Sequence, residues 1–335
     1  MSKYISIFLL FISSVCFGQN KQYLKLIETV SLDSLRKYEY KLASAEFSGR
    51  RVNTSTGLLS SNYISNCFKN NGLKAIYENG KSYSQNFLID IKLQKISGTQ
   101  NISSDFLAQN IIGILPGKNQ KLGHLVITAH HDHMGIVDNE ILYGADDNGS
   151  GISALIELSR ILGTSFKNGI RPKRTIIFLS TDAEEKRLLG SDYYINNPVL
   201  PIKNVFCNVN FDMIGRIDST HLVSKNLNNY IYCIFRDTTN QVLNDFYLNQ
   251  LNNNYTQLIL DERYENEAKS KVPYSLITRS DHYPFMKKGI PSIWLFSGFH
   301  NDYHQTTDTP DKICYPELKK RVQFVLALIW DLANK

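Results

Sequence analysis

The stretch LVITAHHDH at residues 125–133 joins an apolar run to four side chains that can bind metals or protons. Residues 125–128 are apolar or β-branched, which is typical of a strand inside a parallel sheet. Because successive side chains of a strand point to opposite faces, His130 and Asp132 are predicted to share one face and His131 to lie on the other. A histidine ligand commonly donates its second ring N–H to a carboxylate, so His130 with Asp132 behind it suits a metal site. Taken alone, the motif also fits ordinary polar surface residues.

Outward from this stretch, strand and helix patterns alternate over roughly 200 residues, which predicts an α/β sandwich. Strands are predicted at residues 87–89, 110–115, 125–128, 175–179, 205–211 and 290–296. Helices are predicted at residues 152–162 and 318–332 and within an N-terminal segment at about residues 22–71, where apolar side chains recur with the helical period.

The Asn-rich stretch 226–254 interrupts this alternation. The spacing of Ile231, Ile234 and Phe235 in it favours a helix. We expect the longer segment from Asn226 to Arg279 to shape access to a functional site at the sheet.

Composition and charge indicate a folded protein and exclude some other classes. The chain has 335 residues, of which 42% are hydrophobic and 20% are charged. These values suit a folded protein with a large core and exclude a disordered chain. The formal net charge is +6, but no block of Lys and Arg is long enough to predict nucleic-acid binding. No internal repeat and no linker rich in Pro, Gly or Ser divides the chain, so residues 19–335 are predicted to form one domain.

The first 18 residues have the layout of a secretory signal peptide. Lys3 is followed by an apolar run at residues 4–15 and by small residues around Gly18, with Gln19 as the new N-terminus. The run is shorter than the roughly 20 residues that span a bilayer, so no stable membrane insertion is expected. Export to the periplasm or the extracellular space is therefore predicted.

Four cysteines remain after such cleavage: Cys67, Cys207, Cys233 and Cys314. No Cys-x-x-Cys pair is present, which argues against a thiolate metal site. Three disulfide pairings are open to four cysteines, but buried free thiols are the favoured interpretation for a chain with so large a core.

Further acids and histidines follow the other predicted strands. They lie in the segments GADDNGSG (144–151), STDAEE (180–185), NFDM (210–213), SDH (280–282) and HNDYHQTTDT (300–309). Ligands of open α/β sheets bind at the carboxyl ends of the strands, where these segments meet. Several converging carboxylates repel one another unless cations neutralise them. A set of histidines and carboxylates suits zinc in particular.

The ordered series HxD, GADDNGSG, AEE, NFDM, SDH and YHxxxDT resembles the secreted di-zinc aminopeptidases, metallopeptidase family twenty-eight, over about residues 42–313. The Ser48-Gly49-Arg50 region also resembles a segment before the family's first helix. The resemblance implies a three-layer α/β sandwich with a mixed, mostly parallel central sheet flanked by helices. The segment between the strands near Phe87 and His130 is too short for the protease-associated domain that some members carry.

The resemblance also implies a site with two zinc ions per chain and peptides as substrates. The metal ligands it implies are His130, Asp147, Glu185, Asp212 and His304. Asp147 would bridge the ions and be followed by a cis peptide bond, whereas Asp146 would not be a ligand. Glu184 matches the general base, and Tyr303 matches a tyrosine that polarises the oxyanion in some members. His131, His133 and His300 are expected to lie outside the ligand set, and Asp132 is expected to support His130.

Several functions stay open at this point. Glutaminyl cyclases share the motif series but bind one zinc and release ammonia, and dipeptidases and glutamate carboxypeptidases are related. A non-catalytic binding protein on the same scaffold is the remaining alternative, although a complete ligand set with a base argues against it. Gln305 stands where many members have threonine, which affects the surroundings of His304 rather than the ligand set. The oligomeric state does not follow from the sequence.

Overall fold

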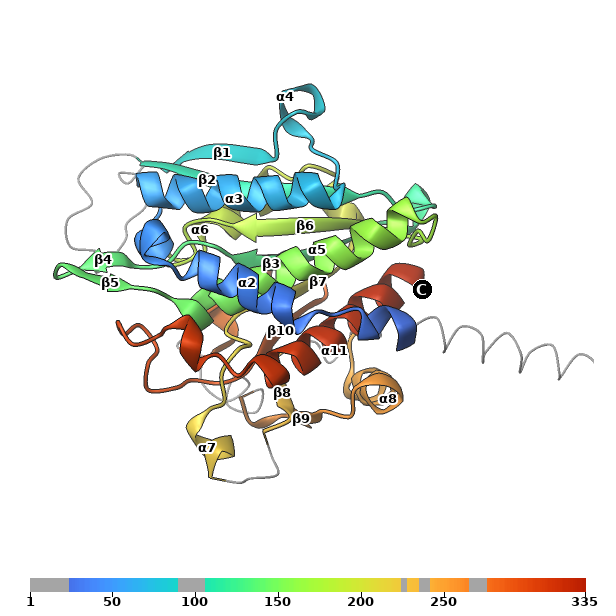
Figure 1. Ribbon diagram of the computed structural model, residues 1–335. Coiled ribbons are helices and arrows are strands. Elements are labelled where there is room, and N and C mark those ends of the chain that lie inside the picture. The colour runs from blue at the N-terminus through green and yellow to red at the C-terminus, as the bar shows by residue number, and fades with distance from the viewer. Residues whose placement is uncertain (1–23, 90–105, 224–227, 235–241, 265–275) are drawn as a thin grey trace, which may run out of the picture.

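A single eight-stranded sheet runs through the middle of the protein (Figure 1). In this computed structural model the described residues are 24–89, 106–223, 228–234, 242–264 and 276–335. The strand order is β1-β2-β6-β3-β7-β10-β8-β9. The four central strands β6, β3, β7 and β10 are parallel to their neighbours within this group, whereas β1, β2 and β8 introduce antiparallel pairs. The sheet is therefore mixed and mostly parallel, which confirms the predicted fold class.

The strands of the main sheet are β1 (Ser84–Ile89), β2 (Phe106–Leu115), β3 (His124–His130), β6 (Thr175–Thr181), β7 (Val205–Phe211), β8 (Tyr230–Ile234), β9 (Ile259–Asp261) and β10 (Ser292–Phe296). A separate hairpin is formed by β4 (Gly135–Val137) and β5 (Glu140–Leu142). Every residue of β3 and β6 is buried. Burial on both faces explains why these strands read as continuous apolar runs rather than as alternating ones.

Helices cover both faces of the sheet. They are α2 (Leu32–Leu42), α3 (Ser55–Asn71), α4 (Tyr77–Gly80), α5 (Gly151–Lys167), α6 (Leu189–Asn196), α7 (Ser219–Leu222), α8 (Asp245–Tyr255), α10 (His282–Lys287) and α11 (Tyr315–Asn334). Helices α3, α5 and α11 pack on one face, with α2 lying across α5 and α11 (Figure 1). Helices α6 and α10 pack on the other face against β2 and β7.

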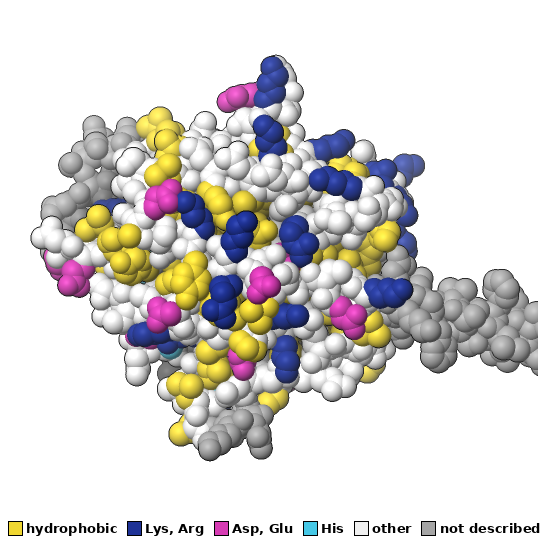
Figure 2. Space-filling view, viewed as in Figure 1, with side chains coloured by type: hydrophobic (Ala, Val, Ile, Leu, Met, Phe, Trp, Pro, Cys, Tyr) yellow, Lys and Arg dark blue, Asp and Glu magenta, His cyan; other side chains and the backbone are white. Residues whose placement is uncertain are grey.

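Four hydrophobic clusters lie among the described residues, and the two largest follow from this layering. The larger core lies between the sheet and helices α5 and α11, and the smaller one lies between the sheet and helices α6 and α10. The outer faces of the helices are mixed, since Tyr40 on α2 and Leu58 and Leu59 on α3 are exposed. Figure 2 shows Lys and Arg side chains dispersed over the helical face rather than gathered in one block.

The region around β8 differs from the sequence prediction. Ile231 and Ile234 belong to a strand, not to a helix, and all five residues of β8 are buried. A short, wholly apolar run between two neighbouring strands has no solvent-facing side, so its apolar spacing does not distinguish strand from helix. Phe235 lies outside the described residues.

The predicted signal peptide at residues 1–18 also lies outside the described residues and stays a prediction. Among the described helices, none is long and apolar enough to cross a membrane.

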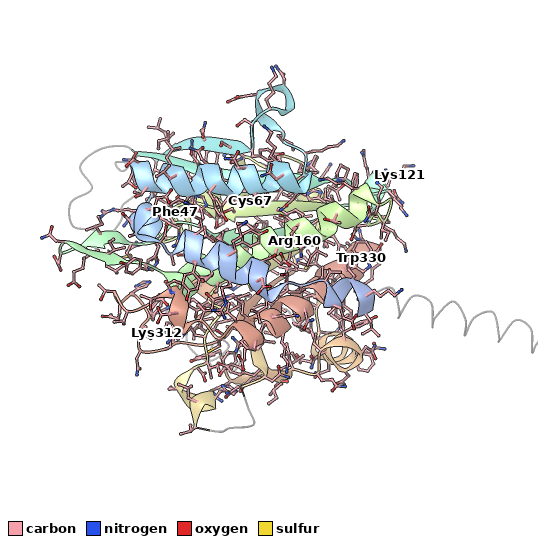
Figure 3. All side chains as sticks on the ribbon, in the orientation of Figure 1. Phe47, Cys67, Lys121, Arg160, Lys312 and Trp330 are labelled. Carbon is pink, nitrogen blue, oxygen red and sulfur yellow. The ribbon has the colours of Figure 1, made fainter. Side chains whose placement is uncertain are left out.

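The four cysteines of the described chain all carry free thiols. Cys207 and Cys233 are buried, and Cys67 lies half-buried on α3 (Figure 3). This agrees with the interpretation that cysteine has a packing role here rather than a cross-linking one.

Candidate metal centre

The implied ligands gather at the carboxyl edge of the parallel strands. His130 is the last residue of β3, Asp212 directly follows β7, and Glu185 lies in the loop after β6. Strand β3 pairs in parallel with both β6 and β7, so these three strand ends meet. Asp147 lies in the helical turn η3 (Ala145–Ser150) before α5, and His304 comes from the loop after β10.

The first half of the site is centred on His130. Its Nε2 atom lies 3.3 Å from Asp212 Oδ1 and 3.3 Å from Asp147 Oδ1. Glu184 is close by, with Oε2 at 3.9 Å from the same nitrogen. Ser280 donates a 2.6 Å hydrogen bond to the second carboxylate oxygen of Asp212. His130, Glu184 and Asp212 together form one group of donor atoms close enough to hold a cation.

The second half of the site lies on the other side of Asp147. His304 Nε2 is 2.9 Å from Asp147 Oδ2 and 3.6 Å from Glu185 Oε1. The two oxygens of the Asp147 carboxylate therefore face different histidines. This is the position that a ligand bridging two cations would take. The Asp147–Asn148 peptide bond is cis, as the resemblance implies.

His133 lies in this second half, where the sequence analysis did not place it. Its Nδ1 is 2.8 Å from Glu185 Oε1 and 3.8 Å from Asp147 Oδ2. The three side chains form the second group of converging donor atoms. His133 therefore lies among the candidate donor atoms, and the prediction that it is not a metal ligand stays a prediction. Strand β3 ends at His130, so the alternation of faces along the strand does not extend to His133.

The donor atoms of the second half lack hydrogen-bond partners. His133 Nδ1, Glu185 Oε1 and His304 Nε2 are buried and have no such partner in the described part of the chain, although 2.8 Å separates the first two. The short contacts of these atoms are ion pairs, at 2.8 Å between His133 and Glu185 and at 2.9 Å between His304 and Asp147. Buried polar atoms without partners are costly, and a shared cation would satisfy all three. Imidazole and carboxylate donors of this kind fit zinc.

The charges of the first half are strongly coupled. Burial disfavours a charged His130, but the Glu184 and Asp212 carboxylates outweigh burial and raise the pKa of His130 well above its ordinary value. Burial raises the pKa of Glu184 well above its usual range, against the opposing effect of His130. A carboxyl group with a raised pKa next to a cluster of ligands is suited to accept and release a proton.

In the second half, the histidines hold the carboxylates ionised. Burial and Asp147 act to raise the pKa of Glu185, but His133 and His304 outweigh them and lower it to about 2. Burial disfavours a charged His304, yet Asp147 and Glu185 raise the pKa of His304 to about 10. The adjacent Glu184 and Glu185 thus have opposite pKa shifts, which separates a proton-transfer group from an ionised ligand.

Asp132 supports the site in a different way from the one expected. Its carboxylate accepts hydrogen bonds from the backbone N–H groups of Glu184 at 3.0 Å and Glu185 at 3.3 Å. His130 Nδ1 instead lies 3.2 Å from the backbone carbonyl of Asp132, with the carboxylate at 3.8 Å. Asp132 therefore positions the two glutamates and, through its carbonyl, the imidazole of His130.

The turn that carries Asp147 is held by residues to which the sequence assigned no role. The Asp308 carboxylate accepts hydrogen bonds from the backbone N–H groups of Asp146 and Asp147. The guanidinium of Arg50 contacts the carbonyls of Gly144 and Asp147. Both residues lie within the motif regions, Asp308 in the last motif and Arg50 near the start, but only their positions in the fold reveal what they hold.

The remaining polar residues of these motifs point away from the ligands. His131 Nε2 lies 3.0 Å from Ser61 Oγ on α3, and its Nδ1 lies 2.9 Å from Ser180 Oγ. Asp146 accepts a hydrogen bond from the backbone of Gly215 and contacts His300. None of His131, Asp146 and His300 belongs to the two donor groups found among the described residues.

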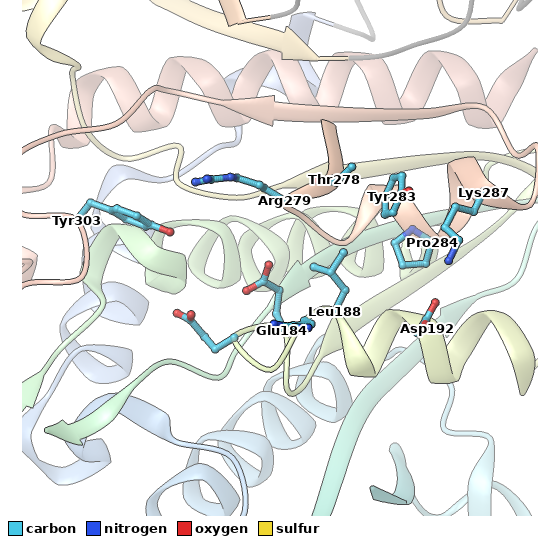
Figure 4. A pocket seen from close by; sticks show the side chains of 11 residues that line it. Glu184, Leu188, Asp192, Thr278, Arg279, Tyr283, Pro284, Lys287 and Tyr303 are labelled. Atoms are coloured by element: carbon cyan, nitrogen blue, oxygen red, sulfur yellow. The ribbon is translucent and has the colours of Figure 1, made fainter. Parts of the chain in front are cut away.

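A cavity of about 430 Å³ opens beside the glutamates. Glu184, Glu185 and Tyr303 line it together with side chains from the start of α10 and from the end of the segment 226–279. Figure 4 shows the Tyr303 ring directed into this pocket, across from Glu184. The ring of Tyr303 also stacks on His304, with centroids 3.9 Å apart.

Comparison with known proteins places the chain among peptidases. The sequence profile of peptidase family M28 matches residues 110–329. Aminopeptidase YwaD of Bacillus subtilis (strain 168) is 26% identical over 271 residues, which cover 77% of this chain and 50% of that protein. The chain thus spans about half the length of this curated relative.

Solved structures with the same fold include two kinds of enzyme. BSAP, a zinc aminopeptidase from Bacillus subtilis, aligns with a TM-score of 0.61 and 18% identity over 91% of this chain and 96% of that one. A glutaminyl cyclase from Porphyromonas gingivalis aligns with a TM-score of 0.61 and 19% identity over 89% of this chain and 97% of that one. At such identities the likeness shows the fold alone.

Proposed function

The chain belongs to peptidase family M28, and on this premise we propose that it is a zinc-dependent exopeptidase, an aminopeptidase that removes the N-terminal residue of peptides. The observation that carries the proposal is the position of Asp147 between two groups of donor atoms. Asp147 belongs to one group and has its other carboxylate oxygen 3.3 Å from His130 of the other group, which suits a pair of cations as in many hydrolytic metalloenzymes.

The residues present fit two zinc ions. His130 and Asp212 would hold one, Glu185 and His304 the other, and Asp147 would bridge them, with His133 as an additional donor on the side of Glu185. Bound zinc would supply a Lewis acid for the scissile carbonyl and lower the pKa of an attacking water. The protein groups around it orient the peptide and move the protons.

Glu184 is the proposed general base. Its carboxylate faces both the cavity and the first half of the site, and Asp132 fixes the backbone of Glu184 by a hydrogen bond. In this position Glu184 takes the proton of the attacking water and delivers it to the amine that leaves. Its raised pKa makes the first transfer, in which Glu184 accepts the proton, easier than it would be for an ordinary carboxylate.

Tyr303 is proposed to donate a hydrogen bond to the oxyanion that forms at the scissile carbonyl. Burial and the nearby carboxylates raise the pKa of Tyr303 well above its ordinary value. The phenol therefore keeps its proton and stays a hydrogen-bond donor over the working pH range.

A glutaminyl cyclase is the second candidate, because an enzyme of that kind has the same fold. Cyclisation releases ammonia from an N-terminal glutamine and needs one zinc. The second group of donor atoms around His133, Asp147 and Glu185 has no evident purpose in that reaction.

Metal analysis combined with a substrate assay tests the proposal. The purified chain, saturated with zinc and freed of excess metal, is expected to hold about two zinc ions and to release p-nitroaniline from leucine p-nitroanilide. One firm equivalent of zinc together with ammonia release from an N-terminal glutamine would favour the cyclase. Zinc binding without either reaction would favour a non-catalytic binding protein.

A further inference from the structure

The cavity beside the metal centre has a cationic wall. Arg187, Arg279 and Lys287 line it, and all three are exposed to solvent. Apart from Glu184 and Glu185, which belong to the metal centre, the acidic residue that lines it is Asp192. The part of the pocket that a substrate side chain or chain end would occupy is therefore net positive.

Arg279 extends toward the residues proposed to take part in the reaction. It follows the short helix η5 (Leu276–Thr278), and Figure 4 shows its side chain extending along the pocket toward Tyr303, above Glu184. Among the described residues, no carboxylate or other acceptor contacts its guanidinium. The buried arginines behave differently, since Arg50 and Arg321 donate to several backbone carbonyls.

An unpaired guanidinium in a cleft has a clear chemical preference. Its planar fork of N–H donors matches a carboxylate in a bidentate geometry, and a neutral amide offers no such partner. A wall of a cleft on which positive charges outnumber negative ones also raises the local concentration of anionic ligands. Arg187 and Lys287 on the same wall add to this field without needing direct contact.

We infer that this pocket binds a carboxylate of the substrate through Arg279, so that the enzyme prefers peptides with an acidic group next to the scissile bond. The inference rests on the proposed exopeptidase function. The carboxylate has two sources, the side chain of an acidic residue and the free C-terminus of a very short peptide. Both present the same group to the guanidinium.

Two matched substrate pairs separate these sources. Aspartyl and asparaginyl p-nitroanilide differ in a side-chain charge and have no C-terminal carboxylate. Leucyl-glycine and leucyl-glycinamide differ only in the C-terminal charge. For the zinc-loaded wild-type chain, kcat/KM is expected to be about tenfold or more higher for the acid than for the amide in at least one pair, the size expected of a charge-assisted hydrogen bond.

The Arg279→Gln variant should reduce that acid-to-amide ratio by roughly tenfold, and Arg279→Glu should invert the preference. Arg36→Gln, which removes the same charge from the exposed surface of α2, is the matched control and should keep the wild-type ratio. Thermal unfolding of each variant checks that the fold is intact, which is expected because Arg279 is exposed.

The outcomes are distinct. A reduced ratio in the aspartyl pair assigns the site to an acidic side chain, and a reduced ratio in the leucyl-glycine pair assigns it to the C-terminal carboxylate. Hydrolysis of all four substrates with ratios near one, or a ratio that Arg279→Gln leaves unchanged, overturns the inference but not the exopeptidase. If none of the four is hydrolysed, the proposed function itself fails and the inference with it.

Discussion

Two buried polar clusters lie side by side in this protein and differ in how their polar atoms are satisfied. Arg50 is fully buried, and its guanidinium donates to the carbonyls of His131, Leu42, Tyr143, Gly144 and Asp147. The candidate metal centre is partly exposed at His304, yet the Glu185 Oε1 and His304 Nε2 atoms are buried and have no hydrogen-bond partner in the described chain. One cluster is satisfied by the described chain itself, whereas the other has donor atoms that a bound cation would satisfy.

The two clusters share the turn at Asp147. Arg50 contacts the backbone carbonyl of this residue, while the side-chain carboxylate faces His130 and His304. The difference shows two uses of buried polar groups in this protein. A buried cation whose N–H groups all donate to carbonyls fixes the backbone. Converging carboxylates and imidazoles without hydrogen-bond partners indicate a site for a bound cation.

The largest effect is expected at Glu184, which neither fixes the backbone as Arg50 does nor belongs to the proposed zinc ligands. Glu184→Gln keeps the size of the side chain but cannot accept a proton, so turnover should fall by about 10²–10⁴-fold while the zinc content is retained. Activity and zinc content are measured on the same preparation. Glu185→Gln is the matched variant and should lose zinc, because an uncharged amide is a poorer ligand. If Glu184→Gln lost zinc and Glu185→Gln kept it, the two roles would be reversed.

The second-largest effect is expected at Arg50, in the cluster whose polar groups are satisfied by the chain itself. Arg50→Lys keeps the charge but has too few donors for the carbonyls around it, so the free energy of unfolding should fall by about 3 kcal/mol. Urea denaturation of the zinc-free protein measures this loss. Arg51→Lys changes the exposed neighbour and should stay within about 0.5 kcal/mol of the wild type. Equal stability of both variants would contradict a structural role for Arg50.

A smaller effect is expected from a substitution of His133 in the candidate metal centre. His133→Gln should weaken zinc binding by about 10- to 100-fold, whether the imidazole binds the metal or only orients Glu185. Competition with a chelator gives the affinity. His131→Gln is the control, because His131 contacts Ser61 and Ser180 instead of the ligands. A zinc affinity that changes in the His131 variant and not in the His133 variant would refute the assignment.

The smallest effect is expected at Ser61. Ser61→Ala removes the hydroxyl next to His131 Nε2 and leaves that buried nitrogen without a partner, which should cost about 1–2 kcal/mol of unfolding free energy. Zinc content and turnover should not change. Burial lowers the pKa of His131 to about 3, so this loss should be the same at pH 6 and pH 8.

The parts of this fold that the sequence predicts are those with a local signature. The strand at residues 125–128 and helix α5 show their periods directly in the chain, and the residues that follow each parallel strand meet for topological reasons. The position of β8 was missed, because a strand buried on both faces has no polar side to mark its period.

The candidate site was also predicted only where its residues have a local sequence signature. His133 was predicted to lie outside the ligand set because five matched positions already completed it. Its place beside Glu185 was not foreseen, because the chain leaves the strand after His130. Arg50 holds carbonyls from segments that are distant in sequence, and a carbonyl has no sequence signature. Contacts of this kind depend on the path of the chain and become visible only in the fold.

The position of Asp308 late in the chain determines the order in which the site can be assembled. Its carboxylate holds the backbone of Asp146, 162 residues earlier in the chain, and His304 comes from the same late loop. During synthesis His130, Asp147 and Asp212 are all made well before these partners exist. Long-range closures of this kind form slowly, because the entropy of the intervening chain must be lost first. The Asp147 turn therefore gains the part of its support that Asp308 provides only after residue 308 has been made, and the proposed site cannot be complete before then.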